Sequence, residues 1–237
     1  MIPIDLHTHT VASGHGTTDT IADLAKAAAA KGMTVLGISD HGPKTFCAGT
    51  PSYFRSLALS PRQRSGVRIL CGAELNILNG GELDLSQDIQ AGLDYVIVSM
   101  HRPPRRPASR EENTADYLRA LSQPCVRILG HCDNTQFPCD YEAIVRACET
   151  NHVIVEVNES SLMPGGYHQV PGVDTRENYR RLLTLCRERS LPVLLSSDSH
   201  GRSRIGEMPQ CEQLVRELDY PEFLIVNHHL ELLLRRK

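Results

Sequence analysis

The stretch IPIDLHTHT, residues 2–10, joins a short apolar run to two histidines spaced two apart, His7 and His9. Side chains alternate between the two faces of a β-strand, so both imidazoles of an HxH pair point to the same side. Imidazole is the commonest metal ligand that proteins supply. We therefore expect a metal site at the end of this strand, with His15 in the following small-residue loop as a further candidate ligand.

Six more apolar or β-branched runs follow this one and alternate with amphipathic stretches. The apolar residues of these stretches recur at intervals of three and four, which is typical of helices with one buried face. Strand followed by helix, repeated along a chain, predicts a parallel sheet buried on both faces. The predicted strands are residues 2–6, 35–39, 67–73, 95–100, 126–130, 153–157 and 193–197, and the predicted helices are residues 21–30, 111–121, 141–149, 177–189 and 210–218.

Polar side chains stand at the C-terminal end of every predicted strand. An open sheet would spread these ends along a ribbon, whereas a barrel brings them to one mouth. We therefore expect a distorted seven-stranded (β/α) barrel in a single domain over residues 1–237. Residues 223–226 are an alternative eighth strand, residues 227–236 have the pattern of a terminal helix, and closure by seven or eight strands stays open. The strand-end residues are His7 and His9, Asp40 and His41, Glu74, His101, His131, Asn158 and Glu159, and Asp198 and His200.

Composition narrows the function classes. Hydrophobic residues make up 41% of the chain and charged residues 22%, as in ordinary globular proteins. A net charge of −3 disfavours a protein that grips nucleic acid with a basic surface, although a local basic patch stays open. No apolar run is long enough to span a membrane, and no secretion signal is evident, so we expect a cytoplasmic protein. The eight cysteines form no CxxC pair, which favours reduced thiols over a disulfide framework.

Each strand-end group has an ordinary alternative explanation. A single histidine is more often a satisfied core residue than a ligand, Glu74 fits a salt bridge, and His15 fits a solvated loop. Repetition at strand after strand favours a metal site, because the ordinary explanation must be invoked separately each time. A carboxylate such as Glu74 can bridge two cations, and Asp198 can ligate metal and orient water. The histidines that lack this context are predicted to be surface or structural residues; they are His152, His168, His228 and His229.

The ordered motifs HTHT at 7–10, SDHG at 39–42, GAE at 72–74, SMH at 99–101, GH at 130–131 and SSDSH at 196–200 resemble the polymerase and histidinol phosphatase (PHP) superfamily. The match spans nearly the whole chain, and it is most similar to the stand-alone YcdX-type phosphatases. This resemblance implies a distorted seven-stranded barrel that carries three metal ions. It assigns His7, His9, Glu74 and Asp198 to the first metal, Glu74, His101 and His131 to the second, and His15, His41 and His200 to the third.

The expected activity is that of a metal-dependent phosphatase acting on phosphate monoesters of small molecules. Metal lowers the pKa of a bound water, and the resulting hydroxide attacks phosphorus. Asp198 and His200 are predicted catalytic residues, and Asp40 is predicted to orient a ligating imidazole. Zn²⁺ is the first choice of metal, with Mn²⁺ or Fe²⁺ as alternatives. Basic residues that follow the ligands are predicted to steer phosphate; they are Lys44, Arg102, Arg105, Arg106, Arg202 and Arg204.

Two other functions stay open from the residues alone. A 3′ exonuclease or phosphodiesterase would use the same metal chemistry, although an aromatic content of 5% offers little stacking surface for single strands. A metal-binding regulatory module would keep the ligands without turnover. An amidohydrolase is disfavoured because no predicted strand ends in lysine. Where PHP relatives often continue the His131 motif with proline, this chain has Cys132 and Asp133, which predicts a thiol and a carboxylate beside the second metal. The oligomeric state is left open.

Overall fold

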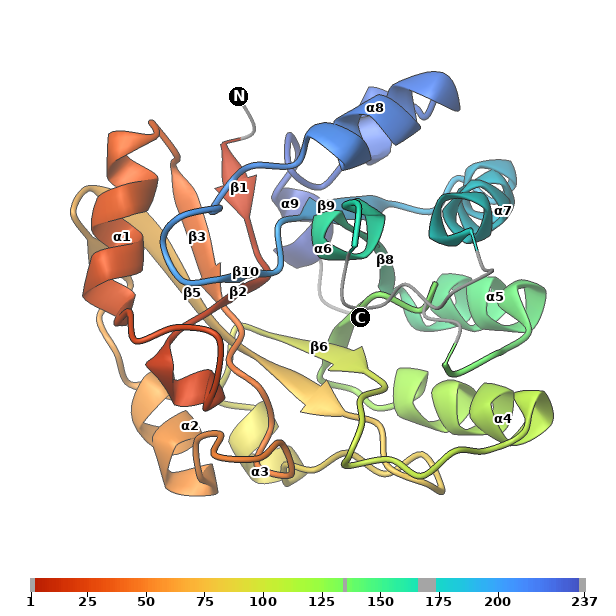
Figure 1. The fold of residues 1–237 in the computed structure, drawn as a ribbon, viewed down its shortest axis with the longest axis horizontal. Helices are drawn as coiled ribbons and strands as arrows, with labels where there is room; N and C mark the ends of the chain where they lie inside the picture. Colours follow the sequence, from red (N-terminus) through yellow and green to blue (C-terminus); the bar gives the residue numbers. More distant parts are fainter. Residues whose placement is uncertain (1–2, 134–135, 166–173, 235–237) are drawn as a thin grey trace.

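The computed structural model describes residues 3–133, 136–165 and 174–234. Seven parallel strands lie side by side in chain order, as successive βα units require, and they curl almost into a barrel (Figure 1). This confirms the predicted fold. The seven strands are β1 (Ile4–Asp5), β3 (Val35–Ile38), β5 (Val67–Asn76), β6 (Tyr95–Ser99), β7 (Val126–Leu129), β8 (Ile154–Asn158) and β9 (Val193–Ser196).

The helices cover the outside of the sheet (Figure 1). Several start where the sequence supplies a polar cap for the free N–H groups of the first turn: Thr20 and Asp23 form a capping box on α1, and Ser109 and Glu112 form one on α4. The helices are α1 (Ile21–Ala30), α2 (Pro51–Ala58), α3 (Gln87–Gln90), α4 (Arg110–Leu121), α5 (Tyr141–Asn151), α6 (Glu159–Leu162), α7 (Thr175–Glu188), α8 (Pro209–Glu217) and α9 (Glu231–Leu234).

Side chains inside the barrel change character along its axis. Alternate strand residues such as Tyr95, Ile97, Ile154 and Leu194 form an apolar cluster in the interior. Their neighbours in sequence belong instead to the larger core beneath the helices. The period of two places Glu156 and Asn158 on the same inner face as Ile154, one and two steps closer to the C-terminal end of the strands. The interior is therefore apolar below and polar at that end.

Asn227 joins the first and last strands. Its side-chain amide donates to the carbonyls of Ile4 and Leu195, at 2.9 and 2.7 Å, and its amide oxygen accepts from the N–H of Leu195 at 2.8 Å. Above this seam, β2 (Thr8–His9) pairs in parallel with β10 (Ser199–His200). The edge strands that flank the opening are thus bridged by a side chain and by a short two-stranded ladder.

In the C-terminal region the structure decides one open alternative and corrects one prediction. Residues 223–226 are not a regular strand: Glu222–Leu224 form a 3₁₀ turn, and Ile225 makes one isolated parallel bridge with Val193. The predicted helix over 227–236 is described only as the single turn Glu231–Leu234, because the Asn227 side chain is committed to the strand seam; residues 235–237 lie outside the described part. Helix α2 was not predicted. Short β4 (Gln63–Arg64) adds an antiparallel ladder to β5.

Helices of the described residues are all too short or too polar to cross a membrane.

Candidate metal centre

The structure brings all nine predicted ligands to the C-terminal mouth of the barrel. A cavity of about 310 Å³ opens there, and ligands supplied by strands and loops from both ends of the chain line it. Beneath these, His7, His9 and Glu74 are fully buried. The residues that line the cavity are His15, Gly16, His41, Thr45, His101, Arg102, His131, Ser160, Asp198 and His200.

Glu74 stands at the middle of the cluster, with each of its two oxygens facing a different group of imidazoles. Oε1 lies 2.8 Å from Nε2 of His131 and 3.2 Å from Nε2 of His101. Oε2 lies 3.4 Å from Nε2 of His7 and 2.7 Å from Nδ1 of His41. This two-sided arrangement suits a carboxylate that bridges two cations.

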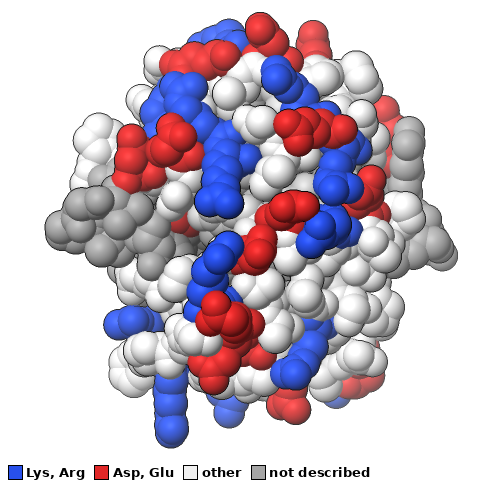
Figure 2. Space-filling model, turned by 90° about the vertical axis from the view of Figure 1, so that its right-hand side faces the viewer, with Lys and Arg blue, Asp and Glu red and all other residues white. Residues whose placement is uncertain are grey.

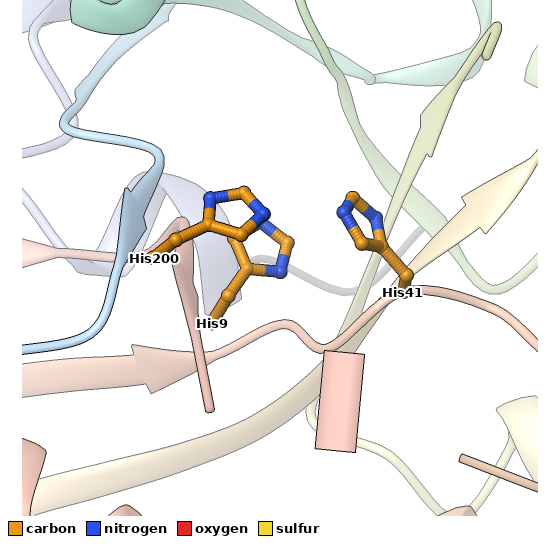
Figure 3. A group of neighbouring side chains, drawn as sticks. All are labelled: His9, His41 and His200. Atoms are coloured by element: carbon orange, nitrogen blue, oxygen red, sulfur yellow. The ribbon is translucent and has the colours of Figure 1, made fainter. Parts of the chain in front are cut away.

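A second group of imidazoles lies on the other side of the mouth. Parallel pairing of β10 with β2 sets His200 directly beside His9, and the two rings stack with centroids 4.2 Å apart. Figure 3 shows the ring of His41 turned toward this pair. His15 folds over the mouth and stacks on His41 at 4.9 Å. Gly16, at φ +79°, makes this possible, because a Cβ there would lie 2.6 Å from the His200 ring.

Glu156 determines which nitrogen of His7 faces the cluster. Its Oε1 lies 2.5 Å from Nδ1 of His7 and can only accept, so Nδ1 carries a proton and Nε2 is the nitrogen that faces the cluster. The hydroxyl of Ser196 and the backbone N–H of His131 donate to the same carboxylate. Sequence reasoning missed Glu156, although a charged residue on the inner face of an apolar strand was the signal.

Asp40 acts on His9 through Ser13. The hydroxyl of Ser13 donates to Oδ1 of Asp40 at 2.7 Å, so its oxygen is left to accept from Nδ1 of His9 at 2.9 Å. The hydroxyls of Thr10 and Tyr53 donate to Oδ2 of Asp40. Asp40 therefore obtains its partners from hydroxyls and a backbone N–H rather than directly from an imidazole, and Ser13 transmits its effect to the ligand.

Asn76 fixes His101 in the same way. Its amide nitrogen donates to Oδ2 of Asp84 at 2.6 Å, which identifies the other amide atom, facing Nδ1 of His101 at 2.9 Å, as the oxygen. Nδ1 of His101 thus carries the proton, and Nε2 faces Glu74. Three ligands therefore share one pattern, in which a polar partner holds Nδ1 and presents Nε2 to the cluster.

Asp198 follows β9 in a left-handed backbone conformation, with φ +50°. Strained conformations of this kind persist where surrounding contacts hold them and are common at functional sites. The hydroxyl of Ser197 donates to buried Asp5 just before this turn, and Asn158 donates to Oδ2 of Asp198 at 3.1 Å. Oδ1 lies 3.1 Å from Nε2 of His9. The strained turn therefore aims one carboxylate oxygen at the first pair of histidines.

Burial and neighbouring charges set the protonation of the cluster. Burial, aided by the nearby imidazoles, lowers the pKa of His9 and of His41 to about 3, so both rings are neutral at physiological pH. Burial also acts to lower the pKa of His131, but Glu74 outweighs it and raises the value to about 9. Burial alone would raise the pKa of Glu74 and of Asp198, yet the surrounding histidines hold both well below the ordinary range. Both carboxylates are therefore ionised.

Several buried ligand atoms in the cluster lack a hydrogen bond of good geometry among the described residues, although some face one another closely, as Nδ1 of His41 and Oε2 of Glu74 do at 2.7 Å. They are Nε2 of His7, His9 and His200, Nδ1 of His41, and Oε2 of Glu74. Burying a polar atom without a partner is costly, so such atoms are rare unless something else satisfies them. Three overlapping sets place their ligand atoms within 4.8 Å of one another: His7, His9 and Asp198; His9, His41 and His200; and His41, Glu74 and His101. Imidazole nitrogen and carboxylate oxygen are the donors that Zn²⁺, Mn²⁺ and Fe²⁺ accept, and the residues fit these metals.

Of the basic residues predicted to steer phosphate, Arg102 lines the cavity. Arg105 does not reach it: the side chain is fully buried, and its guanidinium donates to the carbonyl of Leu78, to Asn113 and to Asp116. It anchors the loop that carries His101 and Arg102 instead. Arg202 is exposed and lies 3.8 Å from Asp19. Lys44 and Arg106 are exposed, Arg204 is half-buried, and these three are not among the cavity residues.

The thiol predicted to lie beside the second metal faces away from it. Cys132 is buried in the apolar core beneath the helices, where burial holds its pKa well above the ordinary range. Asp133 is also buried, and burial raises its pKa to about 7. Neither residue lines the cavity. Of the histidines predicted to lie elsewhere, His152, His228 and His229 are outside the cluster, and His168 lies outside the described residues.

Comparison with known proteins identifies the family of this chain. A family model described as the PHP domain matches residues 5–160. The chain belongs to the PHP family. It is 37% identical over 225 residues to a probable phosphatase of Clostridium novyi, covering 94% of this chain and 89% of the relative. A probable phosphatase of Clostridium acetobutylicum is 36% identical over 228 residues, with the same coverage of each chain.

A solved structure of a PHP-like fold extends the comparison. Histidinol phosphate phosphatase from Lactococcus lactis, complexed with zinc, L-histidinol and phosphate, superposes with a TM-score of 0.62 and 16% sequence identity, covering 93% of this chain and 95% of that one. At this identity the likeness establishes the shared fold.

Proposed function

We propose that this PHP protein is a metal-dependent phosphatase that hydrolyses phosphate monoesters of small molecules at a cluster of three divalent ions. The observation that carries the proposal is the set of buried imidazole nitrogens and carboxylate oxygens that converge below a small open cavity without well-formed hydrogen bonds among the described residues. Family membership and the relatives named probable phosphatases support the metal-dependent phosphatase activity.

The ligand geometry supports nine metal-binding residues in three groups. His7, His9 and Asp198 would hold one ion, and Glu74 would link it to a second ion held with His101 and His131. His15, His41 and His200 would hold a third, although Nδ1 of His41 also lies close to Glu74. Divalent ions in such a site neutralise phosphate charge and lower the pKa of a bound water. Zinc in the Lactococcus lactis structure makes Zn²⁺ the first metal to test.

The chain's own residues would prepare the cavity for a phosphoryl group. Arg102 is the arginine at the cavity and would place positive charge against the substrate anion. Asp198 and Glu74 stay ionised and cannot act as proton donors, so their role is to hold cations. Attack by water on phosphorus would break the P–O bond to the alcohol and release inorganic phosphate.

The charge pattern on one face of the molecule disfavours the binding of nucleic acid to that face. Figure 2 shows basic and acidic side chains interleaved on the face that carries α4, α5, α7 and α8 in Figure 1. Several are paired there, as Arg146 is with Glu142 and Arg189 with Glu149, both at 2.8 Å. A paired, alternating surface of this kind offers little net attraction for a phosphate backbone.

The test compares a monoester with a diester on protein of known metal content. Elemental analysis gives the number and identity of bound ions, and p-nitrophenyl phosphate and bis-p-nitrophenyl phosphate give the two activities. We expect turnover of the monoester that a chelator abolishes and added Zn²⁺ or Mn²⁺ restores. Preferential turnover of the diester would identify a phosphodiesterase, and full metal occupancy without turnover of either ester would identify a binding module.

A further inference from the structure

Two residues with a hydroxyl group, Thr45 and Ser160, line the cavity, and their hydroxyl hydrogens have different partners. The hydroxyl of Ser160 donates to the carbonyl of Ser197 at 3.1 Å. The oxygen of Thr45 accepts from Nδ2 of Asn76 at 3.0 Å, and no described residue accepts the hydrogen of this hydroxyl. Thr45 therefore brings an unused donor to the cavity wall.

The partners of the Asn76 side-chain amide determine which of its two atoms is the nitrogen and which is the oxygen. Nδ2 of Asn76 also donates to Asp84, whose carboxylate can only accept, and Oδ1 of Asn76 is held by His101. The Asn76 amide must then be a donor toward Thr45, and the threonine oxygen must be the acceptor. The hydroxyl hydrogen is left to point elsewhere, and the same amide controls both a metal ligand and this hydroxyl.

The loop that carries Thr45 is held in place by the same carboxylate. The backbone N–H of Lys44 donates to Oδ2 of Asp84 at 2.9 Å, and the N–H of Thr45 donates to the carbonyl of Gly42. Gly42 has to be glycine for this contact, because a Cβ there would lie 2.3 Å from Oδ1 of Asp84. The position of Thr45 at the cavity is thus fixed by hydrogen bonds to Asn76, Asp84 and Gly42 and is not that of a free loop residue.

We propose that Thr45 is a substrate-binding residue whose hydroxyl donates a hydrogen bond to a phosphoryl oxygen in the cavity. The inference rests on the proposed function, because it assumes that the cavity receives a phosphate group. A hydroxyl donor toward a charged oxygen contributes more than one toward a neutral oxygen. Asn76 and Asp84 act as positioning residues for it.

The test compares phosphate binding by Thr45→Val, Thr45→Ser and Thr50→Val. Valine keeps the shape of threonine without the hydroxyl, serine keeps the hydroxyl, and Thr50 is an exposed residue of the same loop whose side chain caps no helix N–H. Calorimetry with inorganic phosphate at saturating metal gives the dissociation constant without relying on turnover, and elemental analysis gives metal content.

We expect Thr45→Val to weaken phosphate binding about tenfold or more at unchanged metal content, the range for one hydrogen bond to a charged group. Thr45→Ser should stay within about threefold of the unmodified protein, and Thr50→Val should match it. Equal phosphate binding by Thr45→Val, or a loss that only follows loss of metal, would overturn the assignment. Unmodified protein that binds phosphate without hydrolysing monoesters would overturn the proposed function while leaving this comparison valid.

Discussion

The carboxylate of Glu156 lies 2.5 Å from Nδ1 of His7, in the fully buried interior of the barrel. This contact sets the proton of the ring on the side away from the cluster. A carboxylate behind a ligating histidine fixes its orientation and raises its basicity. The affinity of the cluster for metal therefore depends on a residue that does not line the cavity.

Glu156→Gln should weaken metal binding about 10- to 100-fold. In one orientation the amide nitrogen would face His7 and Ser196, and in the other it would face the donors on His131 and Asn158, so an acceptor is lost on one side in either case. Competition against a calibrated chelator measures the affinity. Glu159→Gln is the matched control, because Glu159 is an equally buried carboxylate whose contacts are the N–H groups at the start of α8. Equal metal affinities in both variants would contradict the role given to Glu156.

Ser13→Ala should weaken metal binding about tenfold or more, because Nδ1 of His9 loses its acceptor and the ring can present either nitrogen. Tyr53→Phe removes a hydrogen bond to the same Asp40 carboxylate without touching His9. It should lower stability by about 1 kcal/mol and leave metal affinity near that of the unmodified protein. Chelator competition and chemical denaturation separate the two effects. A larger loss of metal affinity in Tyr53→Phe than in Ser13→Ala would contradict the role of Ser13 as the link between Asp40 and His9.

Metal loading near pH 7.5 should release protons. His131, with its pKa raised to about 9, is protonated in the metal-free protein, and the pKa of His7 is also raised, by Glu156, Asp198 and Glu74 against the effect of burial. His9 and His41, with pKa values of about 3, have no proton to lose. Ligands must be deprotonated to bind, so metal affinity should rise as pH increases toward 9.

Calorimetry in buffers of different ionisation enthalpy measures this proton release, and roughly two protons per loaded cluster are expected. Proton release that falls by about one proton in His131→Gln but is unchanged in His152→Gln, which lies outside the cluster, would agree with the assignment. Release close to zero at pH 7.5 would show that His7 and His131 are already neutral.

Arg102→Ala should affect substrate binding and Arg105→Ala should affect stability, although the two residues belong to the same loop. Arg102 lines the cavity, so its loss should raise KM for a phosphate monoester about tenfold and leave stability unchanged. Arg105 is buried 2.7 Å from Asp116, and its loss leaves that buried carboxylate with only the N–H of Gly80 and the exposed Arg119, which costs about 3 kcal/mol of unfolding free energy. Steady-state kinetics and urea denaturation on both variants give the comparison. A stable Arg105→Ala protein with raised KM would restore the original prediction for Arg105.

The fold and the nine candidate ligands could be predicted from the sequence because both depend on local pattern. Apolar runs give the strands, and polar residues such as Glu74 and His101 directly after them must meet at one mouth in a parallel barrel. The direction of a loop side chain depends instead on contacts with residues that lie elsewhere in the sequence. Arg105 follows a predicted ligand as Arg102 does, but its partners Leu78, Asn113 and Asp116 hold its side chain in the interior.

The residues that hold the ligands were harder to predict for a related reason. Glu156, Ser13 and Asn76 contact their histidines through the fold, and in sequence they are ordinary strand or loop residues. Glu156 alone carried a signal, because a charged residue on the inner face of a strand needs a partner. The seam at Asn227 left no such trace, since an asparagine before two histidines also fits the start of a helix.

That seam has a consequence for when the protein becomes able to take up metal. Synthesis proceeds from the N-terminus at about 5–20 residues per second, so His7 and His9 are made on the order of ten seconds or more before Asp198 and His200. The amide of Asn227, which fastens Ile4 to Leu195, is made later still. A nascent chain therefore displays its first two imidazoles long before the rest of the cluster exists. Metal selection is then left to the finished polypeptide and to whichever ion is available after its release.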